Sequence, residues 1–162
     1  MCIRDRFYDF QRIRADLTAQ GVRFSSKSDS EILLRLYQRQ GLNATLPLLR
    51  GEFAFALFDR EEDCLYLVRD RFGIKPQYWA MTSEGLVFGS ELKVLFAHPA
   101  VERRFTSEGL FHQLMQTMVP GTTAFAGVHQ VKPGHVLKVQ RAQGQLEVCL
   151  LYTSPSPRDL ST

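Results

Sequence analysis

One carboxylate in the sequence stands where an anion is both stable and chemically useful. Asp29 lies inside the string Ser28-Asp29-Ser30-Glu31, whose S-x-x-E spacing is typical of a helix start. A carboxylate at the first turn of a helix is stabilised as the anion, and it can hold a cationic ligand through a charged hydrogen bond. The alternative is that Asp29 only favours the helix dipole beside its Ser28 cap. These four residues, taken alone, favour the structural role.

A loop rich in basic residues is the second candidate site. It reads Arg69-Asp70-Arg71-Phe72-Gly73-Ile74-Lys75-Pro76. Two arginines and a lysine around a glycine could hold a phosphate with side chains and backbone amides. The alternative is that these cations form ion pairs with Asp70, with Glu91 or with a neighbouring domain, and we expect the ion pairs.

The thiols and imidazoles have no spacing that predicts a metal or a disulfide. They are Cys2, Cys64 and Cys149, and His98, His112, His129 and His135. Cysteines this far apart form neither a zinc motif nor the framework of a small secreted domain. We therefore predict no bound metal and a reducing compartment, the cytoplasm. Because free cysteine usually behaves as a small hydrophobe, we expect Cys64 in a strand and Cys149 in a tail.

Composition and charge are those of a single globular domain. The chain has 162 residues, of which 44% are hydrophobic and 23% are charged, and its net charge is +3. These values exclude a disordered chain, a collagen and a coiled coil. Both signs of charge are interleaved, whereas a nucleic-acid-binding protein clusters its positive charge. No apolar run approaches the roughly 20 residues of a membrane span, so we predict neither nucleic acid nor membrane as a partner.

Two helices must come first, because apolar residues recur at helical spacing in the first part of the chain. Phe10, Ile13 and Leu17 mark one helix, which Gly21 ends. The S-x-x-E string begins a second helix, which Gly41 ends. Asp29 is therefore expected in the first turn of this second helix.

Strand patterns follow the helices. Residues 51–59 alternate with apolar side chains on both faces, which predicts a strand buried on both sides, with Phe55 in the core. The charged turn at 60–63 returns the chain into an antiparallel partner over 64–68. Further strands are expected over 78–81, 86–89, 128–131 and 136–139. One short helix is expected over 91–97, with Ser90 as its cap. Another is expected to begin at its cap, Thr106 or Ser107, and to end at Met115. Strands in hairpin order with helices set apart predict an α+β layered fold.

Both ends of the chain differ from its middle. Residues 1–6 have no pattern, and the Ser-Pro-Ser-Pro string within 149–162 resists helix and central strand alike. Both strings resemble translated sequencing-adaptor tails on open reading frames from environmental DNA. The alternative is a plain disordered tail. We expect non-native tails over 1–6 and 149–162, with the domain itself over 7–148.

Several strings, in order, resemble the glutaminase domain of glutamine-dependent asparagine synthetases. They are Tyr8-Asp9-Phe10, Ser28-Asp29-Ser30-Glu31, Leu49-Arg50-Gly51-Glu52-Phe53-Ala54-Phe55-Ala56, the loop of residues 69–76, Phe88-Gly89-Ser90-Glu91-Leu92-Lys93, Val119-Pro120-Gly121 and Pro133-Gly134-His135. Their order and spacing hold from about Tyr8 to Val139, which is most of the chain. The basic loop is the most specific of them.

The resemblance implies a fold and a reaction. The fold is a class II glutamine amidotransferase, an Ntn-hydrolase αββα sandwich with antiparallel sheets. In this family an N-terminal cysteine attacks the amide carbon of glutamine, and its own α-amine serves as the base. An Asn-Gly pair stabilises the oxyanion, an arginine holds the substrate carboxylate, and an aspartate holds its α-amine. Ammonia then crosses to a synthetase domain, where ATP and magnesium activate aspartate; the glutaminase domain itself needs no cofactor.

Residue by residue, the resemblance assigns one role. Asp29 maps onto the aspartate that holds the ammonium of glutamine, and with the family in view we favour this ligand role. Arg4-Asp5-Arg6-Phe7 stands where the family has its Asn-Gly pair. Cys2 is only a positional look-alike of the nucleophile, because Ile-Arg-Asp-Arg follows it instead of Gly-Ile. The catalytic residue thus stays unknown, and we expect a domain truncated at both ends and inactive.

Two other functions stay open from the sequence. The same domain could feed another acceptor, such as an amino sugar or a peptide amide, or it could be a non-catalytic module that binds a partner domain. Loss of the first strand predicts an irregular segment before Phe7, an unpaired sheet edge and an exposed apolar groove. A homodimer through that edge is the alternative.

Overall fold

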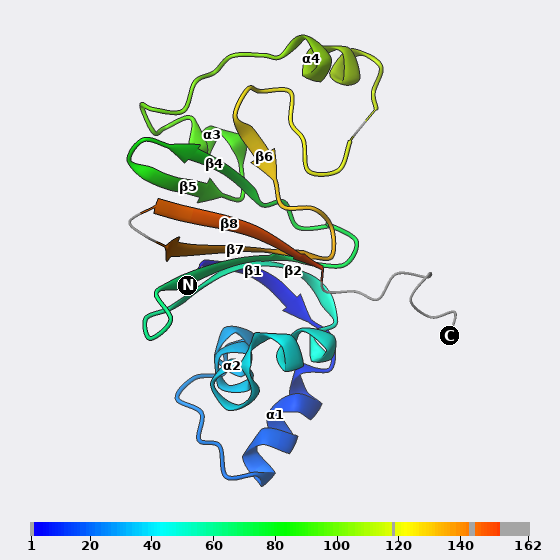
Figure 1. Ribbon diagram of the computed structural model, residues 1–162. Coiled ribbons are helices and arrows are strands. Elements are labelled where there is room, and N and C mark those ends of the chain that lie inside the picture. The colour runs from blue at the N-terminus through cyan, green and yellow to red at the C-terminus, as the bar shows by residue number, and fades with distance from the viewer. Residues whose placement is uncertain (1, 118, 143–144, 153–162) are drawn as a thin grey trace, which may run out of the picture.

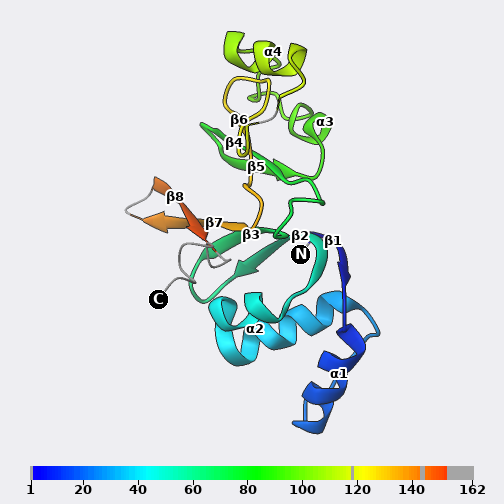
Figure 2. The ribbon, with the colours of Figure 1, turned by 90° about the vertical axis from the view of Figure 1, so that its right-hand side faces the viewer.

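The computed structural model describes residues 2–117, 119–142 and 145–152 of the chain. Their elements are β1 (Cys2–Phe7), α1 (Phe10–Ala19), α2 (Asp29–Thr45), η1 (Leu46–Leu48), β2 (Gly51–Asp59), β3 (Cys64–Arg69), β4 (Tyr78–Thr82), β5 (Gly85–Gly89), α3 (Leu92–Leu95), α4 (Ser107–Leu114), β6 (Val128–Gln130), β7 (His135–Ala142) and β8 (Gln145–Tyr152). Helices α1 and α2 lie on one side of a sheet, and a second sheet with α3 and α4 lies on the other side (Figures 1 and 2). The predicted α+β layered fold is confirmed.

The larger sheet has five antiparallel strands in the order β1-β2-β3-β7-β8. At its centre β2 and β3 form the predicted hairpin, with Phe55 opposite Val68. The Asp59 carboxylate accepts hydrogen bonds from the backbone N–H groups of Glu61 and Glu62, which closes the turn. The charged turn thus reverses the chain between β2 and β3, as the sequence predicts.

Alternation along β2 divides the core into two layers. Phe53, Phe55 and Leu57 belong to the cluster that packs against α1 and α2, whereas Ala56 belongs to the cluster between the two sheets. Phe55 is fully buried, as expected. Phe58 is 56% exposed, which corrects the prediction of a strand buried along both faces. This residue stands at the turn end of β2 and outside both clusters.

The smaller sheet has three strands in the order β5-β4-β6. Trp79, Leu86 and Phe88 pack onto the cluster between the sheets. On its other face, Ala80 and Val128 form a cluster with residues of and around α3. Helix α4 begins at its Thr106 cap, as predicted, but contributes no buried residue to the core.

Glycines and caps set the helix boundaries, with one correction. Gly21 follows α1 with φ 85°, a conformation that suits glycine. Gly41 is non-helical, with φ 72° and ψ 177°, so the helix that begins at Asp29 ends there as predicted, and a second helical segment within α2 continues to Thr45. The short helix α3 is capped at Glu91 and not at Ser90, and it spans four residues only.

The N-terminal segment forms a strand, which corrects the expectation of an irregular segment and an open sheet. β1 pairs with β2 along its whole length, from Cys2 opposite Ala56 to Phe7 opposite Gly51. The free edge of β2 is a ready template for such pairing, whatever side chains the partner carries. The Phe7 side chain is buried, and its ring centroid lies 5.3 Å from that of Phe53. The core is therefore closed on this side.

The C-terminal segment also forms a strand before the described residues end. β8 runs antiparallel to β7, with Cys149 opposite Lys138. Residues 149–152 of the expected tail therefore belong to the sheet. Residues 153–162, with the Ser-Pro-Ser-Pro string, lie outside the described residues, and the non-native origin of both ends stays a prediction.

Candidate functional site

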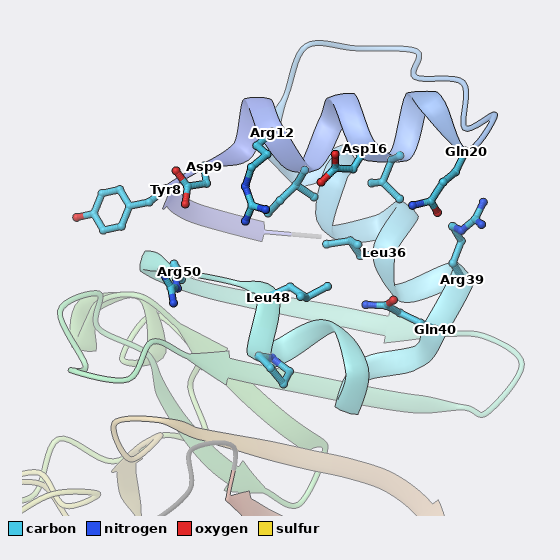
Figure 3. A pocket seen from close by; sticks show the side chains of 13 residues that line it. Tyr8, Asp9, Arg12, Asp16, Gln20, Leu36, Arg39, Gln40, Leu48 and Arg50 are labelled. Atoms are coloured by element: carbon cyan, nitrogen blue, oxygen red, sulfur yellow. The ribbon is translucent and has the colours of Figure 1, made fainter.

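A pocket of about 360 Å³ opens in the helical layer, between α1, the second half of α2 and the segment that leads to β2 (Figure 3). Its apolar lining includes Ile13, Leu17 and Leu36, and charged side chains such as Arg12 and Arg39 surround it. Asp29 begins α2, whereas this pocket lies near the other end of that helix, and Asp29 is not among its lining residues. The pocket is therefore separate from the predicted ligand carboxylate.

A second pocket, of about 340 Å³, lies where β1 ends and β2 begins. Tyr8 and the start of β2 line one part of it, and Phe72 and Ile74 of the basic loop line another. Phe72 is 81% exposed, and the Tyr8 hydroxyl donates to the Glu52 carboxylate at 3.5 Å. The fold thus brings together Tyr8 and the basic loop, two strings that are far apart in the sequence.

Asp29 occupies the predicted place at the first turn of α2. Ser28 is the N-cap, and its Oγ accepts the backbone N–H of Ser30 at 3.2 Å. Among the residues that the structure describes, none donates a hydrogen bond to the half-buried Asp29 carboxylate or forms an ion pair with it. Within the described part of the chain, the Asp29 side chain thus has no capping duty, which leaves it available to a cation. Its predicted direction, toward the open side of the sheet, stays a prediction.

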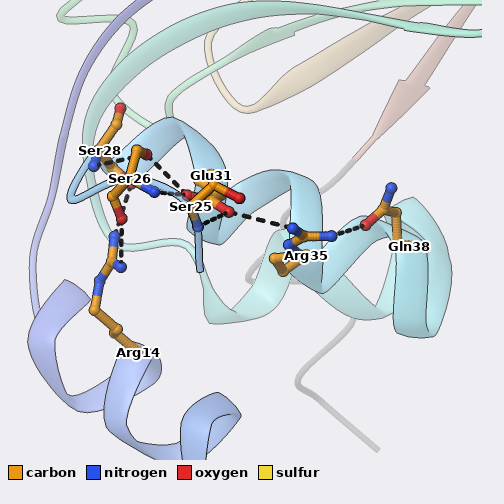
Figure 4. A network of polar contacts seen from close by, with 7 residues as sticks. All are labelled: Arg14, Ser25, Ser26, Ser28, Glu31, Arg35 and Gln38. Carbon is orange, nitrogen blue, oxygen red and sulfur yellow. Dashed lines mark hydrogen bonds and ion pairs between the residues drawn. The ribbon is translucent and has the colours of Figure 1, made fainter. Parts of the chain in front are cut away.

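The Glu31 carboxylate organises the loop in front of α2 (Figure 4). It accepts the backbone N–H groups of Ser25 at 2.8 Å and Ser26 at 2.6 Å, and the Ser26 hydroxyl at 2.8 Å. Arg35 lies 3.3 Å from it. These contacts, with the Ser25 amide first, lower the pKa of Glu31 to about 2. The predicted capping box is thus correct for Ser28, but Glu31 reaches Ser25 and Ser26, while the Ser28 amide donates to Ser26 Oγ.

Arg14 reaches the same loop from α1 (Figure 4). Its two terminal nitrogens donate to the carbonyl oxygens of Ser26, at 2.8 Å, and Ser28, at 3.0 Å. Its Cζ lies 4.3 Å from the centroid of the Phe24 ring, a cation–π contact. Sequence reasoning did not identify Arg14, because its partners are 12 and 14 residues away and no periodicity connects them.

The basic loop is built around its own buried charges. Arg69 donates to the carbonyl oxygens of Gly73, Lys75 and Val131 at 2.7, 2.9 and 2.8 Å. The fully buried Asp70 carboxylate accepts the backbone N–H groups of Phe72, Ile74 and Lys75. Burial lowers the pKa of Arg69. The Arg69 guanidinium is consequently occupied within the protein and is not available to a phosphate.

The expected ion pairs of this loop differ in their partners. Lys75 Nζ lies 3.3 Å from the Glu52 carboxylate of β2, and not beside Asp70 or Glu91. Asp70 is used instead as an acceptor for backbone N–H groups. Arg69, Asp70 and Lys75 thus have structural contacts, although their partners are not the predicted ones, and the roles of Arg71 and of a neighbouring domain stay predictions.

Among the residues whose side chains the structure describes, the remaining thiols and imidazoles do not gather into a site. Cys64 is a buried strand residue, as expected, and burial raises the pKa of its thiol. Cys2 lies in β1, and the structure describes its backbone pairing but not its side chain. Within the described residues no three histidine, cysteine or acidic side chains could hold a metal ion. No helix in the same residues is long and apolar enough to cross a membrane.

Comparisons with known proteins identify a family and several relatives of this chain. The model of the glutamine amidotransferase domain family matches residues 2–149. The chain is 35% identical to asparagine synthetase [glutamine-hydrolyzing] 3 of Bacillus subtilis over 132 residues, which is 80% of this chain and 21% of that protein. It is 37% identical to the amidase chry2 of Gibberella zeae over 135 residues, or 83% of this chain and 19% of that protein. The chain thus spans about a fifth of the length of these relatives.

A solved structure shares the fold. The glutamine phosphoribosylpyrophosphate amidotransferase of B. subtilis superposes with a TM-score of 0.64, at 18% sequence identity, over 96% of this chain and 29% of that one. At this identity the likeness shows the fold alone, and it confirms an Ntn-type arrangement of helices and antiparallel sheets. Because the family model matches far more than half of the residues, the chain belongs to the glutamine amidotransferase domain family.

Proposed function

We propose that this domain binds glutamine for an asparagine synthetase, which hydrolyses the amide to glutamate and ammonia and uses the ammonia to convert aspartate to asparagine. Asparagine synthetases of B. subtilis among the relatives support the reaction. The observation that carries the proposal in this chain is the Asp29 carboxylate, which has no partner among the described residues and stands at the first turn of α2.

Asp29 holds the substrate by its α-ammonium group. A carboxylate beside the first turn of a helix stays ionised, and a charged hydrogen bond to an ammonium is stronger than one between neutral groups. The role is to bind and orient glutamine while its side-chain amide is attacked elsewhere. ATP and magnesium act in the synthetase domain, so this domain supplies no nucleotide chemistry.

Titration of the labelled 162-residue chain with glutamine, followed by NMR, tests the proposal. We expect the amide signals of Asp29 and Ser30 to shift with a Kd of about 1 mM, which corresponds to roughly −4 kcal/mol. Asp29→Asn removes one charged partner, and this costs about 1.5–3 kcal/mol, a ten- to hundredfold weaker Kd. Asp16→Asn, an exposed aspartate of α1, is the matched control and should leave the Kd unchanged. Equal binding by the wild type and Asp29→Asn would contradict the role of Asp29.

One observation favours a second candidate reaction. The relative named an amidase in G. zeae is as similar to this chain as the asparagine synthetases are. Ammonia from the same glutamine site would then go to another carbonyl acceptor. The two are separated by supplying aspartate, ATP and glutamine to an intact protein, in which this domain carries the nucleophile and the Asn-Gly pair of the family and is joined to its second domain. Asparagine formation supports the first reaction, and glutamate release without asparagine supports the second.

The partners in this proposal are glutamine and a synthetase domain, in the cytoplasm. The unclustered cysteines favour a reducing compartment. A second copy could pair along the outer edge of β1, since an edge strand exposes unpaired backbone groups. Sedimentation of the chain at several concentrations tests this homodimer.

A further inference from the structure

The loop of residues 25–28, which leads directly into Asp29, is fixed by side chains from two helices (Figure 4). We call it the entry loop. Its conformation determines where α2 begins and therefore where the Asp29 carboxylate stands. The Asp29 carboxylate has no hydrogen bond among the described residues, so its position depends on the backbone that carries it.

From α1, Arg14 holds the end of the entry loop that leads into α2. Its guanidinium donates to two carbonyl oxygens, those of Ser26 and Ser28, at 2.8 and 3.0 Å. Ser28 is the residue immediately before Asp29. Because a guanidinium presents its donors in a rigid fork, two carbonyls held together fix both the distance and the orientation of this peptide segment.

From α2, Glu31 holds the other end of the entry loop, at Ser25 and Ser26. Its two carboxylate oxygens accept hydrogen bonds from the backbone N–H groups of Ser25 and Ser26. Glu31 is two residues after Asp29 in the same helical turn, so the carboxylate ties the loop to the helix that carries Asp29. Arg35, one turn further along, lies 3.3 Å from the same carboxylate.

We propose that Arg14 and Glu31 are positioning residues for the substrate ammonium: they hold the entry loop from two different helices and thereby place the Asp29 carboxylate for glutamine. The inference rests on the proposed glutamine-binding role of Asp29. Neither residue touches the substrate in this account. A displacement of the charged group by about 1 Å is enough to weaken a substrate contact markedly, and supporting residues of this kind set that precision.

The test compares two ligands that differ only in the group that Asp29 holds. Glutamine and 4-carbamoylbutanoate, which lacks the α-amine, are titrated by NMR into the labelled chain. For the wild type we expect glutamine to bind about tenfold or more tightly than the desamino ligand, since the charged hydrogen bond is lost with the amine. This selectivity ratio is the readout, because a purely structural change would weaken both ligands together.

Three variants address the clamp. Arg14→Gln and Glu31→Gln should reduce the ratio toward one, and Arg14→Lys, which keeps one cationic donor, should restore part of it. Arg12→Gln is the matched control on the same helix, outside the entry loop, and should keep the wild-type ratio. Circular dichroism shows whether each variant is folded. If Arg14→Gln is unfolded, the selectivity ratio of Arg14→Lys tests the clamp instead. A ratio between one and the wild-type value supports the clamp, and the wild-type ratio contradicts it.

The outcomes separate this inference from the proposed function. A wild-type ratio in folded Arg14→Gln and Glu31→Gln, together with a ratio near one in Asp29→Asn, would overturn the positioning role and leave the proposed function intact. A ratio near one in the wild type would overturn both, because there would be no ammonium site to position.

Discussion

The carboxylate of Asp70 accepts the backbone N–H of Lys75 at 2.9 Å, so the basic loop closes around a buried anion from its own sequence. Arg69 binds the carbonyl groups of the same loop, because its guanidinium donates to the carbonyl oxygens of Gly73 and Lys75. The exposed Phe72 and Ile74 at the pocket beside Tyr8 are therefore held on a rigid support.

Replacing Asp70 by alanine should destabilise the domain strongly. The substitution removes three hydrogen bonds, because three part-buried backbone N–H groups of the loop lose their charged acceptor, and a hydrogen bond to a charged group contributes about 1.5–3 kcal/mol. We expect the free energy of unfolding in urea to fall by roughly 3 kcal/mol or more. Arg71→Ala, on an exposed neighbour, should change it by less than about 0.5 kcal/mol. Similar stabilities for the two variants would show that the buried anion does not organise the loop.

The stability contributed by Glu31 should depend on acid pH. The pKa of Glu31 is lowered to about 2 in the folded protein, below the roughly 4.3 of a free glutamate. A lowered pKa means stability that is present above the unfolded value and is lost as the pH falls toward the folded value. Urea unfolding of the wild type and Glu31→Gln should therefore differ at about pH 6, and the difference should shrink toward about pH 2.5.

Glu61→Gln serves as the control for this pH dependence, since Glu61 lies in the exposed turn between β2 and β3. Its difference from the wild type should stay small throughout. A Glu31→Gln difference that persists unchanged at acid pH would mean that the loop is held by packing and not by the ionised carboxylate.

The sequence was most informative where a local pattern and burial agreed. The β2–β3 hairpin followed from alternating apolar residues and a charged turn, and the start of α2 followed from Ser28. Helix ends were harder: Gly41 stops the first helical segment as predicted, but a second helical segment follows it directly, and Leu42 and Leu46 of this region are buried in the same core. Tertiary packing decided the outcome there.

The site was predictable only in part, because its supports come from distant residues. Asp29 could be found from its place in a recognised string. Arg14 could not, since nothing local indicates that a residue of α1 binds carbonyls of the entry loop. The strand β1 was missed for a related reason: its pairing is determined by the free edge of β2 and not by a pattern of its own side chains.

Phe55 and Phe58 offer a matched test of the two-layer core on a single strand. Phe55 is fully buried against the helices, whereas Phe58 is 56% exposed. Phe55→Ala should lower the free energy of unfolding by about 3–5 kcal/mol, and Phe58→Ala by less than about 1 kcal/mol. Comparable losses in urea unfolding would contradict the assignment of the two faces.

The chain as it stands should release no glutamate from glutamine. Arg4, Asp5 and Arg6 occupy the place where the family resemblance predicts an Asn-Gly oxyanion pair, and losing one oxyanion donor alone costs about 10²–10³ in rate. A coupled glutamate assay should give the background rate for both the wild type and Cys2→Ser. Measurable release that Cys2→Ser abolishes would identify Cys2 as a nucleophile and overturn this prediction.

The most direct test of the central claim uses Asp29→Asn in an intact synthetase, in which this domain carries the nucleophile and the Asn-Gly pair of the family and is joined to a synthetase domain. The substitution keeps the size of the side chain and removes the charge that pairs with the ammonium of glutamine. Glutamine-dependent asparagine formation should fall ten- to hundredfold, in line with a charged hydrogen bond of about 1.5–3 kcal/mol. Ammonia-dependent formation should stay unchanged, because free ammonia bypasses the glutamine pocket. An equal loss of both activities would contradict the account and would mean that Asp29 serves the fold alone.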